Sequence, residues 1–255
     1  MLISQQSAVG IVPARIDIGR AGEAPHQLAH SGAVILTGVE NNDDALVVAA
    51  AAALGHRLRQ LFPLRQRRSH NGSPVHLHAD SFDVVVDVGC VPHRRRDPDE
   101  DYVLVQCVQP PSSGGDSFLA DAYRFVDDCA TADPALREFL TRTDVDLYGA
   151  WAGLRGLPTT PRVGRHVEYT RTGRRIVRRT DGAVPLHRDP DTEHIEAMLG
   201  RFQDAVRDVE GSLPRFRLAK GEVLILDNYR CWHGRDAHTG DRGVRILTLR
   251  SSDAR

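Results

Sequence analysis

The stretch Val75-His76-Leu77-His78-Ala79-Asp80 decides how this 255-residue chain is interpreted. Side chains alternate between the two faces of a strand, so His78 and Asp80 are expected to point the same way. A later histidine, His233, would complete a set of two imidazoles and one carboxylate. Such a set covers one face of an octahedral metal and leaves the opposite positions open, as non-heme Fe(II) sites require. The tripeptide alone is common, so the case depends on what surrounds it.

Composition limits both the fold and the partners. With 41% hydrophobic residues the chain can bury one large core, and we predict a single domain over residues 1–255. No run approaches the length of a membrane span, and Met1 to Arg20 lacks the pattern of a secretion signal. The four cysteines show no paired spacing, which favours reduced thiols in a cytoplasmic protein. The net charge of −1 gives no reason to expect nucleic acid as a partner.

Patterns along the chain predict strands near both ends and helices between them. Apolar runs indicate strands at 33–36, 102–108, 222–226 and 245–250. Capping residues and amphipathic spacing indicate helices from Asn41 or Asn42 to about 62, from Asp116 or Ser117 to about 129, and from 191 to about 209. Polar composition suggests loops at 69–74 and 93–101. Regular strand–helix alternation is absent, so we predict a mainly β core with peripheral helices.

Residues 155–188 have an unusual composition, with nine arginines against two acids, Glu168 and Asp181. A long irregular segment inside a domain is usually functional or disordered. One hypothesis is a lid over the active site that contacts an anionic group. The other is a solvated loop, because Lys220 is the only lysine and arginine is therefore abundant throughout the chain.

Further motifs follow the opening stretch in a fixed order. They are Gly114-Gly115-Asp116-Ser117 after an apolar strand, then Lys220-Gly221-Glu222 with Asp227-Asn228, then His233-Gly234-Arg235. From about residue 74 to 250 this order resembles the taurine dioxygenase-like and clavaminate synthase-like Fe(II)/2-oxoglutarate oxygenases. The resemblance implies a double-stranded β-helix, a jelly-roll of two facing sheets with the iron near one mouth.

The resemblance also implies roles for individual residues. His78, Asp80 and His233 would be the Fe(II) ligands. Ser117 falls where the family has a hydroxyl that bonds to 2-oxoglutarate. Arg245 lies twelve residues beyond His233, where an arginine of the family holds the carboxylate of that cosubstrate.

The last strand departs from the family pattern at one position. Many relatives place a second arginine four residues beyond the first, but Leu249 stands there and the next arginine is Arg250. Alternation puts Arg245 and Arg250 on opposite faces, so only one can point into the barrel. We predict that Arg245 does, and that Arg250 lies at the surface.

Two other aromatic side chains lie close to these motifs. His76 shares the strand face of His78 and could border the site, although a packing or hydrogen-bonding role is favoured. Trp232 is expected in the core or in the wall of the site.

The leading functional hypothesis is an oxygenase that uses Fe(II), 2-oxoglutarate and O₂ to hydroxylate a small polar metabolite, such as an amino acid in a biosynthetic pathway. An anionic or carrier-tethered substrate is one option, and the oligomeric state is left open. The scaffold also supports desaturation, cyclisation and epimerisation, whereas Asp80 disfavours halogenation. Nucleic-acid demethylases share the histidine-any-aspartate motif, but the segment 114–117 and the absence of a basic N-terminal half argue against one. The alternative from another class is a barrel that binds metal or metabolite without turnover.

Overall fold

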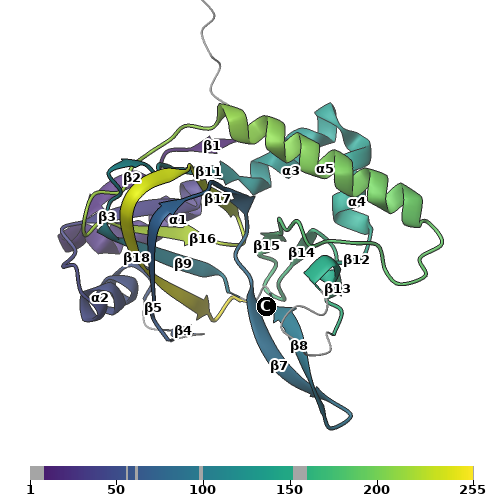
Figure 1. Cartoon of the computed structure of the whole chain (residues 1–255), viewed down its shortest axis with the longest axis horizontal. Coiled ribbons are helices and arrows are strands. Elements are labelled where there is room, and N and C mark those ends of the chain that lie inside the picture. The colour runs from purple at the N-terminus through teal and green to yellow at the C-terminus, as the bar shows by residue number, and fades with distance from the viewer. Residues whose placement is uncertain (1–8, 56, 61–62, 98–99, 152–159, 255) are drawn as a thin grey trace, which may run out of the picture.

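Two β-sheets face each other in the computed structural model, which describes residues 9–55, 57–60, 63–97, 100–151 and 160–254 (Figure 1). The smaller sheet has the order β1 (Gly10–Ile11), β11 (Ser117–Asp121), β17 (Cys231–Arg235), β6 (Val75–His78). The larger has the order β10 (Ser113–Gly114), β18 (His238–Ser251), β9 (Tyr102–Gln109), β16 (Val223–Asp227), β3 (Ala33–Thr37), β2 (Ala14–Asp17). Two more strands, β4 (Leu58–Gln60) and β5 (Arg65–Gly72), pair with β18. This is the expected jelly-roll architecture.

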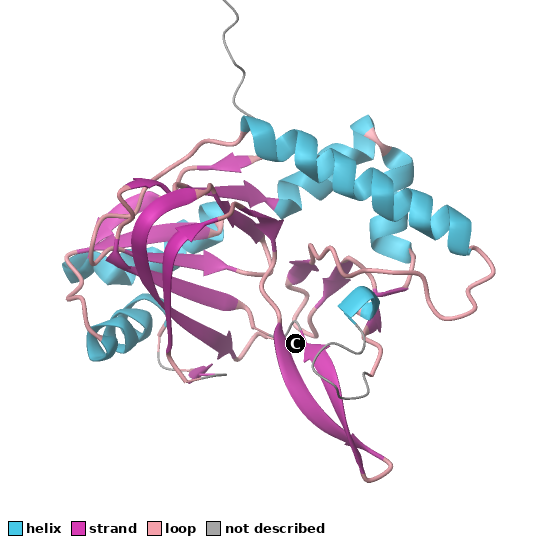
Figure 2. Ribbon diagram, viewed as in Figure 1, coloured by secondary structure: helices cyan, strands magenta, loops and turns pink. Residues whose placement is uncertain are grey.

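Helices cover the outer face of each sheet (Figure 2). Beside the larger sheet lie η1 (Ile18–Glu23), α1 (Ala24–Ser31) and α2 (Asp43–Leu54). Beside the smaller sheet lie α3 (Ala122–Ala132), α4 (Pro134–Arg142) and α5 (Thr192–Ser212). The fold therefore has three apolar layers, one between the sheets and one under each group of helices.

Strand β16 shows how the sequence specifies these layers. All of its residues are buried. Val223 and Ile225 pack under α1 and α2, whereas Leu224 and Leu226 pack between the sheets. Alternate side chains enter different cores, so a strand covered on both faces is a continuous apolar run.

Shorter elements complete the chain. The hairpin β7 (Phe82–Val88) and β8 (Val91–Asp97) projects away from the two sheets (Figure 1). Beyond it lie β12 (Val145–Asp146), η2 (Gly149–Trp151), β13 (Val163–Gly164), β14 (Val167–Tyr169) and β15 (Arg175–Val177). Among the described residues, no helix combines the length and the apolar character needed to cross a bilayer.

Four predicted elements differ from the structure. The helix predicted to reach about residue 62 ends at Leu54, and β4 follows it. The expected loops at 69–74 and 93–101 are largely strands, β5 and β8. The helix predicted from Asp116 or Ser117 begins only at Ala122, because residues 117–121 form β11. Its cap is Asp121, whose carboxylate accepts the backbone N–H groups of Tyr123 and Arg124.

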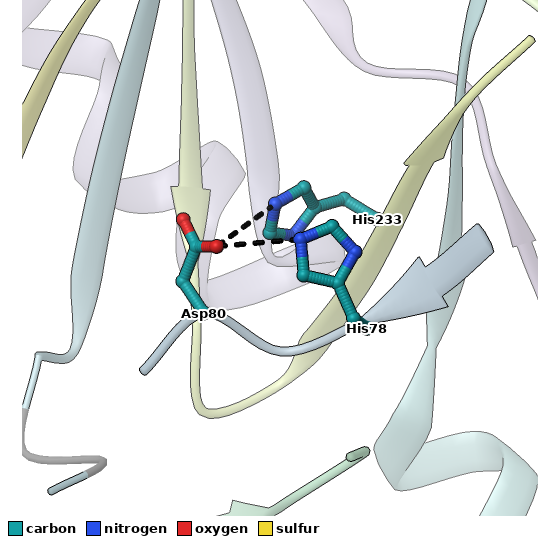
Figure 3. A group of neighbouring side chains, drawn as sticks. All are labelled: His78, Asp80 and His233. Carbon is teal, nitrogen blue, oxygen red and sulfur yellow. Dashed lines mark ion pairs between the residues drawn. The ribbon is translucent and has the colours of Figure 1, made fainter. Parts of the chain in front are cut away.

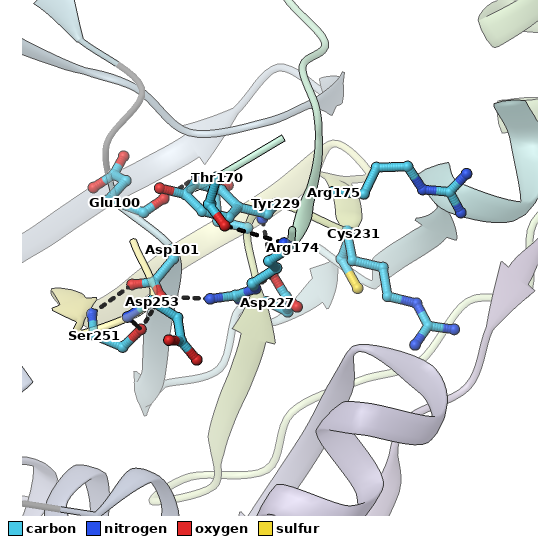
Figure 4. A network of polar contacts seen from close by, with 12 residues as sticks. Glu100, Asp101, Thr170, Arg174, Arg175, Asp227, Tyr229, Cys231, Ser251 and Asp253 are labelled. Carbon is cyan, nitrogen blue, oxygen red and sulfur yellow. Dashed lines mark hydrogen bonds and ion pairs between the residues drawn. The ribbon is translucent and has the colours of Figure 1, made fainter. Parts of the chain in front are cut away.

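A buried ion cluster centred on Arg174 joins three distant segments (Figure 4). Its guanidinium lies 2.6 Å from the carboxylate of Asp101 and 2.8 Å from that of Asp227. Asp101 is 0% exposed and also accepts the backbone N–H and the hydroxyl of Ser251. The cluster thus connects the segment before β15 with three other places: the start of β9, the end of β16 and the end of β18.

Replacing Arg174 by alanine should lower the free energy of unfolding by about 3–5 kcal/mol, because two buried carboxylates lose their counter-ion. Urea denaturation followed by circular dichroism measures this loss. The control is Arg207→Ala, since Arg207 pairs with Asp204 in a pair that is 69% exposed on both sides and is worth less than about 1 kcal/mol. Equal losses in the two variants would contradict the structural role of the cluster.

Candidate functional site

Two neighbouring strands bring the two predicted histidines together. β6 and β17 are antiparallel, and their register sets His78 directly opposite His233. Opposed residues of such a pair share one face of the sheet, and the two imidazole centroids are 4.2 Å apart. On the other face, Leu77 and Trp232 pack into the core under α3 and α5. The apolar neighbours therefore fix the direction in which both histidines point.

Strand pairing does not position Asp80, because β6 ends at His78. The side chain of Asn228, which is 3% exposed, forms hydrogen bonds with both backbone polar groups of Asp80. Its amide oxygen accepts the Asp80 N–H at 2.8 Å, and its amide nitrogen donates to the Asp80 carbonyl at 3.0 Å. The turn after β16 thus holds the segment that carries the carboxylate.

The three side chains converge on one point (Figure 3). The carboxylate Oδ1 of Asp80 lies 3.3 Å from His78 Nε2 and 3.8 Å from His233 Nε2. One nitrogen or oxygen atom from each residue lies within 4.8 Å of the others. The predicted residues are therefore assembled as a candidate metal site.

The three donors set one another's protonation: burial acts to lower the pKa of His78, but Asp80 outweighs it and raises that pKa. Burial, together with the neighbouring His78, lowers the pKa of His233 to about 4, so this imidazole is neutral at pH 7. Burial acts to raise the pKa of Asp80, but His233 and His78 outweigh it and hold that pKa below its usual value. His78 Nδ1 lies 2.9 Å from the His76 carbonyl, to which it donates, so Nε2 is the nitrogen left facing Asp80. Two imidazoles and an ionised carboxylate match the donor set expected for Fe(II).

Two cavities adjoin the triad. The first, about 190 Å³, lies between the sheets; besides the triad, its lining includes Ser117, Leu119, Leu224, Arg242 and Ile246. The second, about 350 Å³, shares His78 and Asp80 with the first; its lining also includes His76, Trp151, Arg179, Thr180 and Asp181. The site can therefore hold two small molecules beside one metal.

Of the two residues predicted to bind 2-oxoglutarate, only Ser117 lies at the site. Arg245 is on the outer face of β18, where its guanidinium bonds to Asp43 and Asn41, each at 2.5 Å, and to Gln106 at 3.3 Å. The expected placement of Arg245 inside the barrel is thus corrected: its face is the one that packs towards α2.

Arg242 is the arginine that the last strand presents to the triad's cavity, together with Val244 and Ile246. Among the described residues it makes no hydrogen bond or ion pair, and burial lowers its pKa. It lies nine residues beyond His233, whereas the family-like distance of twelve points to Arg245. No local signal distinguishes it, because the strand carries apolar side chains on both faces.

The remaining aromatic predictions agree with the structure. Trp232 is fully buried, and its indole donates to the Val177 carbonyl at 3.1 Å. His76 bonds to Glu210 at 2.8 Å and borders the second cavity. Neither takes part in the triad.

Arg250, expected at the surface, is half-buried near the end of β18.

Most described arginines of the segment 155–188 already have partners. Residues 155–159 of the arginine-rich segment lie outside the described residues. In the remainder, Arg175 pairs with Asp127 and Arg178 with Glu168, both at 2.7 Å, and Arg165 pairs with Asp144 at 3.1 Å. These arginines bind carboxylates of the protein itself, so their number does not measure affinity for an anionic ligand. That the segment closes as a lid stays a prediction.

Solved structures with this fold are similar in overall arrangement at low sequence identity. A taurine dioxygenase from Burkholderia xenovorans superposes with a TM-score of 0.63 at 15% identity, over 96% of this chain and 90% of that one. AAD-2 in complex with Mn(II) and N-oxalylglycine gives a TM-score of 0.62 at 14% identity, over 95% of each chain. PvcB, described as an Fe, alpha-ketoglutarate dependent oxygenase from an isonitrile synthetic pathway, gives 0.57 at 16% identity, over 94% and 85%.

Sequence comparison places the chain more directly. No curated protein matches it. The model of the taurine catabolism dioxygenase TauD, TfdA family matches residues 15–250, nearly the whole chain. The chain therefore belongs to the TauD/TfdA family of dioxygenases, which use Fe(II), 2-oxoglutarate and O₂.

Proposed function

We propose that this protein hydroxylates an unactivated C–H bond of a small polar metabolite, with His78, Asp80 and His233 as the Fe(II) ligands. The observation that carries the proposal is the convergence of these three side chains between two cavities. Three protein donors on one face leave the opposite metal positions open for other molecules. When bound, Fe(II) supplies the oxidising chemistry, in which O₂ hydroxylates the substrate while 2-oxoglutarate is converted to succinate and CO₂.

The cavity between the sheets suits 2-oxoglutarate. It is the smaller of the two and is lined largely by apolar side chains. Two cations line it, Arg235 and Arg242, and Arg235 already donates to backbone carbonyls of Asp236 and Ser73. A guanidinium binds a carboxylate through two parallel hydrogen bonds, which fixes the far end of the cosubstrate. The hydroxyl of Ser117 lines the same cavity and can donate to the same carboxylate.

The larger cavity then receives the substrate. Its lining includes His78 and Asp80, so a molecule held there presents one of its bonds to the metal. The apolar wall between the sheets limits the access of water, which protects the reaction from side products. The task of the chain is to orient the substrate, and the cofactor supplies the reactivity.

Incubation of the protein with Fe(II), 2-oxoglutarate and O₂ over a panel of amino acids and related metabolites tests this function. Succinate formation stimulated by one compound, with a product 16 mass units heavier, is expected. A product 2 mass units lighter would indicate desaturation or cyclisation, and an isomeric product would indicate epimerisation. Stoichiometric binding without succinate would favour the non-catalytic barrel.

Asn228 should act as a positioning residue for the metal ligand. In Asn228→Ala the segment of Asp80 loses both of its side-chain anchors, and Fe(II) affinity should fall about 10- to 100-fold, as when outer-shell partners are removed. Anaerobic titration with Fe(II) measures this, and saturating Fe(II) should restore much of the rate.

The control is Asn42→Ala. Asn42 caps α2 through the Ala45 N–H, so its loss should cost about 1 kcal/mol of stability without changing Fe(II) affinity. Equal Fe(II) affinities in the two variants would show that Asn228 acts only on stability.

A further inference from the structure

The cavity proposed for the substrate is bordered by one arginine whose backbone is fixed against the metal-binding segment. The carbonyl of Arg179 accepts the backbone N–H of Ala79, the residue between His78 and Asp80, at 3.0 Å. Arg179 also lines the cavity, together with Thr180 and Asp181. The distance between the Arg179 backbone and the triad is therefore set by a hydrogen bond.

Arg179 differs from the neighbouring arginines because it has no counter-ion among the residues that the structure describes. Arg174, Arg175 and Arg178 each form an ion pair with a carboxylate of the chain. For Arg179, no hydrogen bond or ion pair of the guanidinium is found within the described part of the chain. Its Nε is buried without a partner, and the group lies over the ring of Phe202, 5.7 Å from the centroid.

The charged groups nearest to Arg179 do not neutralise it. Burial lowers the pKa of Arg179, Arg207 adds to this effect, and Asp181 and Glu210 oppose it. Glu210 is already committed, since its two carboxylate oxygens bond to His76 Nδ1 and to the Leu77 N–H, both at 2.8 Å. Asp181 is exposed, so water and salt screen its charge. A partly desolvated cation without a partner is costly, and such groups occur where a ligand supplies the missing charge.

We infer that Arg179 binds a carboxylate of the substrate, so that the substrate of this oxygenase is a carboxylic acid. The planar guanidinium suits a carboxylate because two parallel hydrogen bonds can form. Bound in this way, the acid is anchored in the cavity that His78 and Asp80 also line, and it extends one of its C–H bonds towards the triad. This inference rests on the proposed function and adds the chemical class of the substrate.

A first experiment needs no ligand. Because the guanidinium of Arg179 has no hydrogen-bond or ion-pair partner in the described part of the chain, Arg179→Gln should melt at the same temperature as the wild type or higher. The matched variant is Arg178→Gln, its neighbour, which removes the buried 2.7 Å ion pair with Glu168 and should melt several degrees lower. If Arg179→Gln is destabilised as much as Arg178→Gln, Arg179 has a structural role and the inference is wrong.

A second experiment measures binding without turnover. The protein is loaded with Mn(II) and N-oxalylglycine, and its melting temperature is recorded with each of a panel of small carboxylic acids, the amino acids included, and with the corresponding carboxamides. Some acids should stabilise the wild type, and their carboxamides should not. For the best acid, Arg179→Gln should bind about 10- to 100-fold more weakly, which corresponds to the loss of a charged hydrogen bond.

Three results would overturn the inference. Carboxamides could bind as tightly as the acids, or Arg179→Gln could keep wild-type affinity for the best acid. The third such result is that no acid stabilises the wild type more than the variant. Arg179→Gln should bind Mn(II) and N-oxalylglycine as the wild type does. If the wild type itself fails to bind these two, the proposed function fails, and this outcome is distinct from a failure at Arg179.

Discussion

Asp80→Ala is expected to abolish 2-oxoglutarate turnover, and His78→Ala and His233→Ala should do the same. Each variant removes one of three donor atoms that lie within 4.8 Å of one another. Two protein donors hold a labile divalent metal poorly. Fe(II) affinity and turnover should therefore each fall by more than about 100-fold, which is the largest loss expected when an outer-shell partner of a metal ligand is removed. Succinate formation and anaerobic Fe(II) titration measure the two consequences separately.

The fold should survive all three substitutions, because the triad is only partly buried and faces two cavities. Circular dichroism and melting temperature check this point. His194→Ala is the matched histidine variant: His194 is exposed on α5, and its loss should leave Fe(II) affinity and turnover unchanged. A triad variant that keeps near wild-type turnover would exclude that residue as a ligand.

The triad could be predicted from sequence because each part has a local signal. Strand periodicity gave the direction of His78, and the apolar neighbours Leu77 and Trp232 point the opposite way into the core. The position of Asp80 is less local than the periodicity implied. It depends on Asn228, a residue 148 positions away whose amide bonds to the Asp80 backbone. The convergence of the three side chains could therefore be expected from the motif, but part of the reason for its geometry lies elsewhere in the chain.

The last strand could not be oriented from sequence. Its two faces are both apolar, since Leu247 and Leu249 pack towards α2 while Val244 and Ile246 face the cavity between the sheets. A strand covered on both sides carries no polarity pattern that distinguishes inside from outside. The acceptors of Arg245, Asn41 and Asp43 among them, lie about two hundred residues away, and sequence alone does not reveal such pairing.

Arg242→Ala should raise the KM for 2-oxoglutarate roughly 100-fold or more, because removing one partner of a buried charged pair costs about 3–5 kcal/mol. Arg242 is the cation of the last strand that lines the cavity between the sheets, and no group among the described residues competes for it there. Nearby Arg235 is a poorer candidate, since its guanidinium already donates to the carbonyls of Asp236 and Ser73. Initial rates of succinate formation against 2-oxoglutarate concentration give the KM.

The matched control is Arg245→Ala, three residues along the same strand. It should lower stability, because Asp43 and Asn41 lose a donor, but it should change the KM for 2-oxoglutarate by less than about twofold, since the side chain lies outside the cavity. Arg242→Lys separates charge from geometry: a lysine keeps the charge but loses the planar pair of donors, so its KM should fall between those of the wild type and Arg242→Ala. A steep rise in KM for Arg245→Ala with none for Arg242→Ala would mean that β18 presents its other face to the barrel. The anchor would then lie twelve residues beyond His233, at the distance that the family resemblance implies.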